Sequence, residues 1–597
     1  MCGIAGIMTA DGSAPAISVL GRMARALAHR GPDGEGRHVL DDVAMVQQRL
    51  AIIDLKTGDQ PLYATNDEIG PNPSRSALVA NGEIYNYVEM RRRMGEDNFE
   101  TRSDCEPAVR RYVERGIEFA QDLRGMYAIA IHDPGHKCLV LSRDPFGIKP
   151  LYYGETEDGF AFASEPQALM AAGLAQPVLR PEARDELLQA QFTCGSETIF
   201  AGIQRLLPGE TIVVRKGRVA ERILVSALPP GERRQISEAA ALAELDEVLT
   251  DTVAVHQRSD VPYGMFLSGG VDSSALLTMM ARLNERPVEA FTAGFPGTGV
   301  ADERAHARAV AEAAGANHHE VEFTAEDFWT RLPQIVAATD DPTADYAILP
   351  TYKLAETARA HGLKVVLSGE GGDELFAGYG RYRRARLPRW LGGRAMRRHG
   401  HLAGFDLLRE ERPGWRDGLA AAEQGALDGR RTRLQEAQAT DIQEWLPNDL
   451  LNKIDRCLMA HGVEGRVPFL DPKMADFAFR LPDGLKVRRG RGKWLLRRWL
   501  EQALPMSRPF ERKRGFTVPV AEWMDAGDRR LGTLVADQPG IAEACWPGAV
   551  EALFATPGPE TGLARWTLLY YALWHHHHML EGDVGGGVLD VLAEAGG

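Results

Sequence analysis

The first residue with distinctive chemistry is Cys2, in the opening stretch MCGIAGI. Removal of Met1 would give Cys2 a free α-amino group, whose ordinary pKa of about 7.7–8.0 suits a base for the neighbouring thiol. Most cysteines near a terminus are instead small buried hydrophobes without a reactive role. Whether Cys2 is a nucleophile therefore depends on the other motifs of the chain.

A second motif is the string LSGGVDSS at residues 267–274, which follows an apolar run and opens a helical pattern. Backbone N–H groups in a glycine-rich turn and at a helix N-terminus bind anions, so a phosphate is the expected ligand. The sequence contains no G-x-x-x-x-G-K-[ST] string and no G-x-G-x-x-G string after a strand. The motif therefore indicates a nucleotide loop of another kind.

A third motif, LSGEGGDELFAGYGRY at residues 367–382, again follows an apolar run and again turns on Ser-Gly. It places Glu370, Asp373 and Glu374 within about one helical turn. Carboxylates this close repel one another unless a cation lies among them, and Mg²⁺ prefers oxygen ligands. A solvated acidic helix start is the alternative that this loop alone leaves open.

Two differently built halves must position these motifs. Up to about residue 214, short β-like runs alternate with Gly, Pro and Asp turns, and helical periodicity is clear only at residues 19–30 and 105–116. A Pro-Pro-Gly break in residues 224–240 indicates a linker. Beyond it, strands alternate with helices, which is typical of a parallel α/β sheet, and from about residue 441 the pattern is mostly helical. We expect the Gly-rich end to be disordered.

Length and composition limit the function further. A chain of 597 residues exceeds one hydrophobic core, so two to four domains are expected. The net charge of −14, from 69 basic and 83 acidic residues, argues against general nucleic-acid binding. The six cysteines have no C-x-x-C spacing, and no apolar run approaches the ~18 residues of a membrane span. We therefore expect a cytoplasmic enzyme without nucleic-acid or membrane partners.

The motifs together resemble those of the glutamine-dependent asparagine synthetases, in the same order and over essentially the whole chain. The first half resembles a class II glutaminase, and the second half resembles a synthetase domain with the pyrophosphate loop of ATP pyrophosphatases. The strings that carry the likeness are MCGI, HRGPD (29–33), RLAIID (49–54), NGEIYN (81–86), SDCE (103–106), RDPFGIKPLYY (143–153), SGGVDSS (268–274), SGEGGDELFAGY (368–379), GVEGRVPFLD (462–471) and GKWLLR (492–497).

This resemblance implies a two-domain fold of the α/β and α+β classes. Residues 2–214 would form a glutaminase domain of the Ntn type, an αββα sandwich. Residues 215–240 would be the linker, and residues 241–582 would form a Rossmann-like parallel α/β domain of the pyrophosphate-loop type. Residues 583–597 would be a Gly-rich tail.

For the first domain, the resemblance implies that Cys2 attacks the side-chain amide of L-glutamine, with its own amine as base. Arg49 would bind the α-carboxylate of glutamine, and Asp104 would bind its α-amino group. The Asn81 side chain and the Gly82 amide would form the oxyanion hole, where neutral donors stabilise the developing charge. Glu83 would complete this pocket.

For the second domain, the resemblance implies that ATP activates L-aspartate as β-aspartyl-AMP, which ammonia from glutamine attacks after passing through an internal channel. The products are asparagine, glutamate, AMP and pyrophosphate. Lys493 would stabilise the phosphoryl charge, and Glu370 would act at the intermediate. The expected ATP and pyrophosphate ligands are Leu267, Ser268, Gly269, Gly270, Asp272, Ser273, Ala293, Ser368 and Gly369. The expected acceptor ligands are Thr343, Glu370 and Asp373, with Mg²⁺ on Asp272 and Asp373. A homodimer is expected at the level of the family only.

The acceptor region, residues 339–355, departs from the family pattern. An arginine is expected where Tyr346 stands, counted without gaps back from Ser368. Tyrosine cannot pair bidentately with a carboxylate. An amidotransferase of the same mechanism that acts on a peptide or a sugar acid therefore stays open. A ring-closing synthetase of the β-lactam type conflicts with the intact glutaminase motifs. A non-catalytic regulatory relative conflicts with the presence of Cys2, Asp272 and Lys493.

Four consecutive histidines, His575, His576, His577 and His578, invite a metal hypothesis. Neighbouring residues on a helix point about 100° apart, so four in a row do not converge on one ion. We expect no native metal site there.

Overall fold

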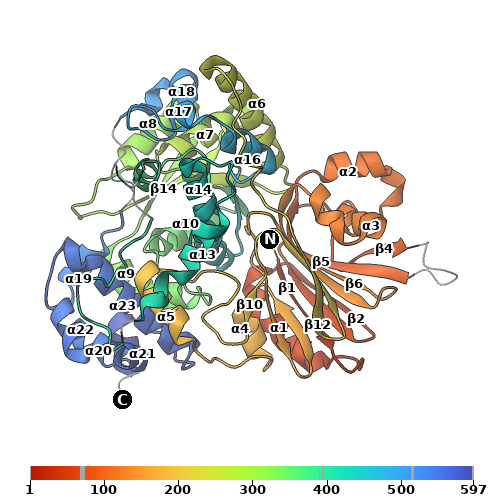
Figure 1. Cartoon of the computed structure of the whole chain (residues 1–597), viewed down its shortest axis with the longest axis horizontal. Coiled ribbons are helices and arrows are strands. Elements are labelled where there is room, and N and C mark those ends of the chain that lie inside the picture. Colours follow the sequence, from red (N-terminus) through yellow and green to blue (C-terminus); the bar gives the residue numbers. More distant parts are fainter. Residues whose placement is uncertain are drawn as a thin grey trace.

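The computed structural model describes residues 2–66, 74–388, 390, 396–410, 412–511 and 517–594. The first part of the chain forms two six-stranded antiparallel sheets, drawn from red to yellow on one side of Figure 1. The first sheet has the order β10-β8-β9-β1-β3-β2 and the second has the order β12-β11-β7-β6-β5-β4. Their bounds are β1 Gly3–Thr9, β2 Gly34–Leu40, β3 Val43–Arg49, β4 Leu62–Asn66, β5 Ser74–Ile84, β6 Gly125–Asp133, β7 Cys138–Arg143, β8 Tyr152–Thr156, β9 Gly159–Ala163, β10 Gln204–Arg205, β11 Glu210–Arg215 and β12 Arg218–Leu224.

Alternation along the strands explains how the two sheets pack. In β1, Ile4 and Met8 point into a core shared by both sheets, whereas Ala5 and Ile7 belong to a cluster on the outer face. Successive side chains of a strand point to opposite faces, so each sheet can bury both of its faces. Helices cover the outer faces: α1 (Ile17–Ala26) and α4 (Pro166–Ala171) on the first sheet, and α3 (Glu106–Arg115) on the second. The expected αββα sandwich is confirmed.

The remaining helices of this half were not apparent in its β-rich pattern. They are α2 (Tyr87–Met94) and α5 (Pro181–Ala190), with short 3₁₀ turns at η1 (Ala28–Arg30), η2 (Glu96–Asn98) and η3 (Gly116–Asp122). Residues 215–240, expected to be a linker, contain β12, which pairs with β11 at the edge of the second sheet. Apart from the two-residue turn at 216–217, only residues 225–237 lie outside helices and strands, and Ser237 caps the next helix.

A five-stranded parallel sheet organises the second part of the chain. Its order is β15-β14-β13-β16-β17, with β13 Tyr263–Phe266, β14 Glu289–Gly294, β15 Asn317–Glu322, β16 Val365–Leu367 and β17 Glu464–Arg466. Numbered along the chain, this is the order 3-2-1-4-5 of a doubly wound sheet. Such sheets bind ligands beyond the carboxyl ends of the strands, where the strand order reverses. That point lies between β13 and β16, the strands that precede the two Ser-Gly loops.

Helices surround this sheet and extend from it. They are α6 Glu238–His256, α7 Val271–Leu283, α8 Arg304–Ala314, α9 Ala325–Ala337, α10 Ile348–Ala360, α11 Gly372–Leu375, α12 Gly380–Ala385, η5 Pro413–Arg416, α13 Asp417–Gly425, α14 Arg433–Thr440, the π-helical η6 Asp441–Leu451, α15 Asn452–Met459, α16 Pro472–Phe479, α17 Asp483–Lys486, α18 Trp494–Ala503, η7 Pro505–Ser507, α19 Val520–Asp525, α20 Leu531–Ala536, α21 Pro539–Ala544, α22 Pro547–Phe554, α23 Pro559–His578 and α24 Val588–Glu594. Among the helices of the described ranges, none is both long and apolar enough to cross a bilayer.

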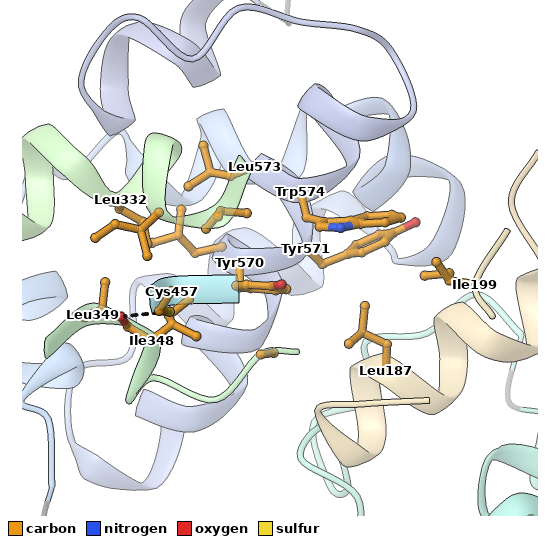
Figure 2. Close-up of a cluster of buried hydrophobic side chains, with 14 of the residues drawn as sticks. Leu187, Ile199, Leu332, Ile348, Leu349, Cys457, Tyr570, Tyr571, Leu573 and Trp574 are labelled. Atoms are coloured by element: carbon orange, nitrogen blue, oxygen red, sulfur yellow. Dashed lines mark hydrogen bonds between the residues drawn. The ribbon is translucent and has the colours of Figure 1, made fainter. Parts of the chain in front are cut away.

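One segment of the first half packs against the end of the chain. Figure 2 shows Leu187 of α5 and Ile199 beside Tyr571 and Trp574 of α23, all in one buried cluster. Phe200 also contacts Trp574, with ring centroids 5.6 Å apart. The segment around α5 is therefore fixed against the helical end of the chain rather than against the two antiparallel sheets alone.

The Gly-rich end is not wholly disordered, contrary to expectation. Residues 588–594 form α24, which packs against α9 through Val588, Val591 and Leu592, all buried in the largest apolar cluster. The last residues, 595–597, lie outside the described part. The apolar spacing of VLDVLAE explains this helix, because positions i, i+3 and i+4 fall on one face.

Candidate active site

Cys2 directly precedes β1, and its thiol lies between the two antiparallel sheets. Its side chain is buried, and burial raises the pKa of the thiol. A buried thiol at neutral pH is therefore protonated and needs a base before it can act as a nucleophile. Gln47 of β3 donates from Nε2 to Sγ of Cys2 at 3.1 Å and so fixes the side chain.

Asn81, on β5 of the facing sheet, completes the surroundings of Cys2. The backbone N–H of Cys2 donates to Oδ1 of Asn81 at 3.0 Å. Asn81 is fully buried, and among the described residues its Nδ2 group has no hydrogen-bond partner. A buried amide donor without a partner is costly unless a ligand supplies the acceptor. The Nδ2 group of Asn81, next to the thiol, is thus suited to bind an oxyanion.

Acidic side chains gather on the same side of the pocket. Glu83 and Asp104 are both buried, and burial together with their mutual repulsion raises the pKa of Glu83 well above its usual range. Asp104 accepts from the backbone N–H of Ile84 at 2.8 Å. Arg49, the last residue of β3, donates to Asp59 Oδ1 and to the Asp54 carbonyl, each at 2.6 Å. The arrangement offers acidic and basic partners to a zwitterionic ligand.

The loop after β13 has the shape that the sequence predicts for a phosphate cradle. Gly270 is the N-cap of α7, and Gly269 has φ +68°, a left-handed conformation that favours glycine. A Cβ on Gly269 would also meet His306 at 3.0 Å. The Ser268 and Ser273 hydroxyls lie 3.1 Å apart across the turn. The loop is therefore held open by its own side chains.

Lys493 connects this loop to the loop after β16. Its ammonium pairs with Asp272 and, at 2.6 Å, with Oδ1 of Asp373. Burial lowers the pKa of Lys493, but the two carboxylates outweigh burial and raise it. Hard oxygen donors such as Asp272 and Asp373 suit Mg²⁺, which proteins usually bind with one or two carboxylates plus substrate phosphates. The two residues fit such a site.

A cavity of about 270 Å³ opens beyond the carboxyl ends of the strands. It brings together most of the expected nucleotide and acceptor residues. These are Leu267, Ser268, Gly270, Asp272, Ser273, Ala293, Ser368, Gly369, Glu370 and Asp373. Gly269 lines a neighbouring hollow of about 310 Å³ on the other side of the same loop. Glu370 accepts a hydrogen bond from the Ser368 hydroxyl at the cavity wall.

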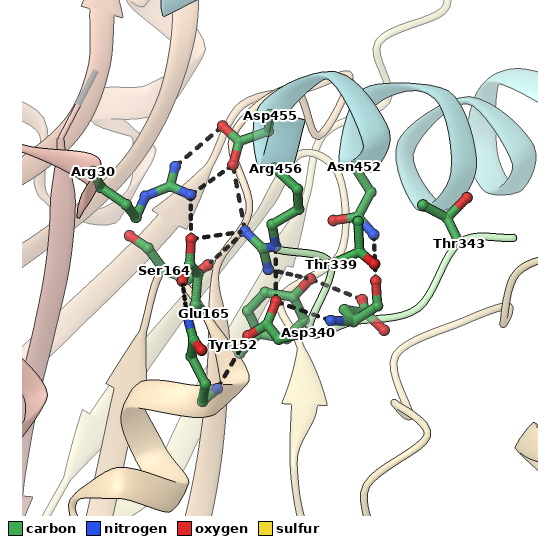
Figure 3. A network of polar contacts seen from close by, with 12 residues as sticks. Arg30, Tyr152, Ser164, Glu165, Thr339, Asp340, Thr343, Asn452, Asp455 and Arg456 are labelled. Atoms are coloured by element: carbon green, nitrogen blue, oxygen red, sulfur yellow. Dashed lines mark hydrogen bonds and ion pairs between the residues drawn. The ribbon is translucent and has the colours of Figure 1, made fainter. Parts of the chain in front are cut away.

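Two residues of the acceptor region, Thr343 and Tyr346, lie outside the described lining of this cavity. Thr343 is fully buried and donates its hydroxyl to Asp449 rather than lining the cavity within the described part (Figure 3 shows its position near α15). Tyr346 is half-buried and packs against the largest apolar cluster. Neither side chain supplies a cation to the cavity.

Two residues around the sites were missed by sequence reasoning, and a third was noticed without a role. Gln47 lies inside β3, which is buried along its whole length, and Lys453 lies on α15, more than seventy positions beyond the loop at residues 367–382. Glu374 was noticed only as one of three close carboxylates. It is buried, and burial with the neighbouring Asp373 raises its pKa to about 8. No local signal marks Gln47 or Lys453.

Buried ion pairs connect the two sites (Figure 3). Arg30 donates to the backbone carbonyl of Cys2 at 3.2 Å and holds both carboxylate oxygens of Asp455 on α15, at 2.8 and 3.1 Å. Arg30 also pairs with Glu165, and Arg456 pairs with Asp340 at 2.8 Å. All five side chains are buried. Removing one partner of such a network leaves an uncompensated charge in the interior.

The histidine run lies in the last turn of α23. His575, His576 and His578 are buried, and burial lowers the pKa of His578 to about 3. Across the described ranges, no group of three His, Cys, Asp or Glu side chains is placed to hold a metal ion.

The fold and the sites define a two-part chain, with a thiol pocket between antiparallel sheets and a nucleotide loop at the switch point of a parallel sheet. The glutamine amidotransferase domain model matches residues 1–223, and the asparagine synthase model matches residues 244–576. The chain belongs to the asparagine synthase family.

Named relatives span most of the chain. It is 30% identical to asparagine synthetase [glutamine-hydrolyzing] 1 of Bacillus subtilis, over 96% of both chains. It is 30% identical to asparagine synthetase B [glutamine-hydrolyzing] of Escherichia coli, over 86% of this chain and 82% of that one. A Mycobacterium tuberculosis protein, provisionally named a glutamine-hydrolysing asparagine synthetase, is 34% identical over 96% of this chain and 97% of its own.

Among solved structures, the glutamine phosphoribosylpyrophosphate amidotransferase of B. subtilis matches 53% of this chain and 65% of its own, at 18% identity and a TM-score of 0.28.

Proposed function

We propose that the chain is a glutamine-dependent asparagine synthetase, with L-glutamine, L-aspartate and ATP as substrates. The single observation that carries this proposal is the presence, on one chain of this family, of a buried thiol beside the buried amide of Asn81 and a separate nucleotide cavity. The first can release ammonia from an amide, and the second can activate a carboxylate. The named relatives, which are glutamine-hydrolysing asparagine synthetases, support the same conclusion.

At the first site, Cys2 is the nucleophile once Met1 has been removed. The free amine takes the thiol proton, and sulfur attacks the amide carbon of glutamine. Asn81 Nδ2 and the Gly82 amide stabilise the oxyanion, while Gln47 holds Sγ in place. The amine returns the proton to the departing ammonia. Water then releases glutamate from the thioester, with Arg49, Glu83 and Asp104 holding the amino-acid end.

At the second site, the aspartate side-chain carboxylate attacks the α-phosphorus of ATP, and pyrophosphate leaves. Lys493 stabilises the charge that develops on the phosphoryl oxygens, and the Ser268–Ser273 turn holds the pyrophosphate. Ammonia then attacks the acyl carbon of the adenylate and displaces AMP. Glu370, at the cavity wall, accepts the surplus proton of that step.

Several finer points belong to the same proposal. Asp272 and Asp373 would hold Mg²⁺, which would neutralise phosphate charge. The boundary between the domains lies within residues 215–240, in the part after β12. An internal channel carries ammonia between the sites. The enzyme acts in the cytoplasm and binds no nucleic acid. Its assembly is a homodimer.

The test follows pyrophosphate release with ATP, Mg²⁺ and glutamine, with and without L-aspartate, while chromatography measures asparagine and glutamate. Pyrophosphate that depends on aspartate and equals the asparagine formed is the expected result. Glutamate release without any response to aspartate would refute aspartate as the acceptor and favour a different carboxylate.

A further inference from the structure

Tyr346 stands where the family pattern has an arginine, so the acceptor site lacks the cation expected at that position. Aspartate brings a second carboxylate besides the one that is activated, and such a group needs a cationic partner in a buried site. The nucleotide cavity is rich in acidic groups: Asp272, Glu303, Glu370, Asp373 and Glu374 all line it. Lys493 already pairs with Asp272 and Asp373, so the second carboxylate of the acceptor needs another cation.

Lys453 is the one basic side chain among the described residues that line the cavity. It lies in the first turn of α15 and is 6% exposed. Its Nζ donates to Oδ2 of Asp345 at 2.7 Å. An ammonium carries three N–H donors, so Lys453 can hold a substrate oxygen while it keeps Asp345.

The surroundings keep Lys453 charged despite its burial. Asp345, Asp449 and Glu370 outweigh the effect of burial and raise the pKa of Lys453. Asp449 is tied to Thr343, and Glu370 accepts from Ser368. The ammonium therefore contacts one carboxylate, Asp345, and lines the same cavity as the carboxylate of the catalytic loop, Glu370.

We propose that Lys453 binds the α-carboxylate of the acceptor and so takes the place of the arginine that Tyr346 replaces. This inference rests on the proposed function and deepens it, because it defines the acceptor as an amino acid with a second carboxylate. The nearby carboxylates supply partners for the acceptor's ammonium group. A sugar acid or a peptide whose one carboxylate is activated would bring no second carboxylate to Lys453, which would then keep Asp345 alone as its partner.

The test compares aspartate with β-alanine, which lacks only the α-carboxylate, in pyrophosphate release with ammonium chloride as the nitrogen source. Lys453→Met should lower kcat/KM for aspartate by at least about a hundredfold, the usual effect of removing one partner of a buried charge pair. It should leave kcat/KM for β-alanine within about threefold. Glutamate release from glutamine, at the separate thiol site, reports whether the variant is folded.

Two further variants keep the test decisive. Lys353→Met removes another ion pair, with Asp327 at 2.6 Å, outside the cavity lining, and should not change the preference for aspartate. Lys453→Arg keeps the positive charge and should raise the KM for aspartate severalfold without changing that for β-alanine, a result that stands even if Lys453→Met does not fold.

Equal losses for aspartate and β-alanine in both Lys453 variants would show a merely structural ion pair and overturn the proposal. An unchanged preference would overturn it as well. A wild-type enzyme that forms asparagine separates these outcomes from failure of the proposed function, in which aspartate elicits no pyrophosphate at all.

Discussion

Asn81 allows the sharpest test of the thiol site. The Asn81→Ala substitution removes both the acceptor for the Cys2 backbone nitrogen, 3.0 Å away, and the buried Nδ2 donor. Loss of one oxyanion donor costs about 10²–10³ in kcat, or about 2.7–4 kcal/mol of transition-state stabilisation. We therefore expect glutamate release from glutamine to fall by that factor. Synthesis from ammonium chloride should stay within about twofold of wild type, because Asn81 is not part of the nucleotide cavity.

Asn81→Asp separates the two roles of the side chain. The carboxylate keeps an acceptor for Cys2 but replaces the neutral donor with a negative charge, so glutamine hydrolysis should fall further than in Asn81→Ala. Asn98→Ala, which removes an exposed hydrogen bond to the Met94 carbonyl, is the control. Glutamine hydrolysis by Asn81→Ala within threefold of wild type would refute the oxyanion role. An equal loss of ammonium-dependent synthesis would show general unfolding instead.

Three other changes test other parts of the molecule. Gly269→Ala should lower aspartate-dependent pyrophosphate release at least about tenfold and spare glutamine hydrolysis. Residue 269 has a left-handed φ, which is unfavourable for alanine, and the new Cβ would lie close to His306. Gly297→Ala, at φ +73° with no described atom within 4 Å of its Cβ, should have no such effect. Arg30→Met should cost about 3–5 kcal/mol in urea unfolding, whereas Arg37→Met at an exposed pair should cost under about 1 kcal/mol. Burial raises the pKa of Glu374 to about 8 from an ordinary 4.5. The protonated carboxyl therefore contributes its full stabilisation below pH 4.5, and the free energy of unfolding falls by on the order of 5 kcal/mol as the pH rises to 8. Glu374→Gln should flatten that part of the stability curve, and an unchanged slope would contradict the burial of an acid there.

The sequence could predict those parts of the sites that short strings encode. A strand, a Ser-Gly turn and a helix start lie within eight residues at the loop after β13, so local chemistry is enough to indicate a phosphate site. The doubly wound sheet then brings the second Ser-Gly loop beside the first, because β13 and β16 are neighbours. The sandwich, by contrast, was expected from the resemblance to class II glutaminases, because strands such as β3 are buried along their whole length and show no alternation.

What the sequence could not show depends on tertiary packing. Gln47 is one polar position in a fully buried strand, and only the approach of β1 gives it the Cys2 thiol as a partner. Lys453 reaches the cavity because α15 packs against α10. The packing of α5 against α23 likewise joins residues nearly four hundred positions apart, and neither helix pattern indicates its partner (Figure 2).

Helix α15 carries residues that belong to both sites and so can hold the two sites at a fixed spacing. Its first turns carry Lys453, which lines the nucleotide cavity, and Asp455 and Arg456, which hold Arg30, Glu165 and Asp340. Arg30 in turn binds the Cys2 carbonyl. A shift of the axis of α15 would move Lys453, Asp455 and Arg456 together, so it would also strain the contact of Arg30 with the Cys2 carbonyl. Because a buried bidentate ion pair is costly to break, α15 favours one fixed spacing between the sites.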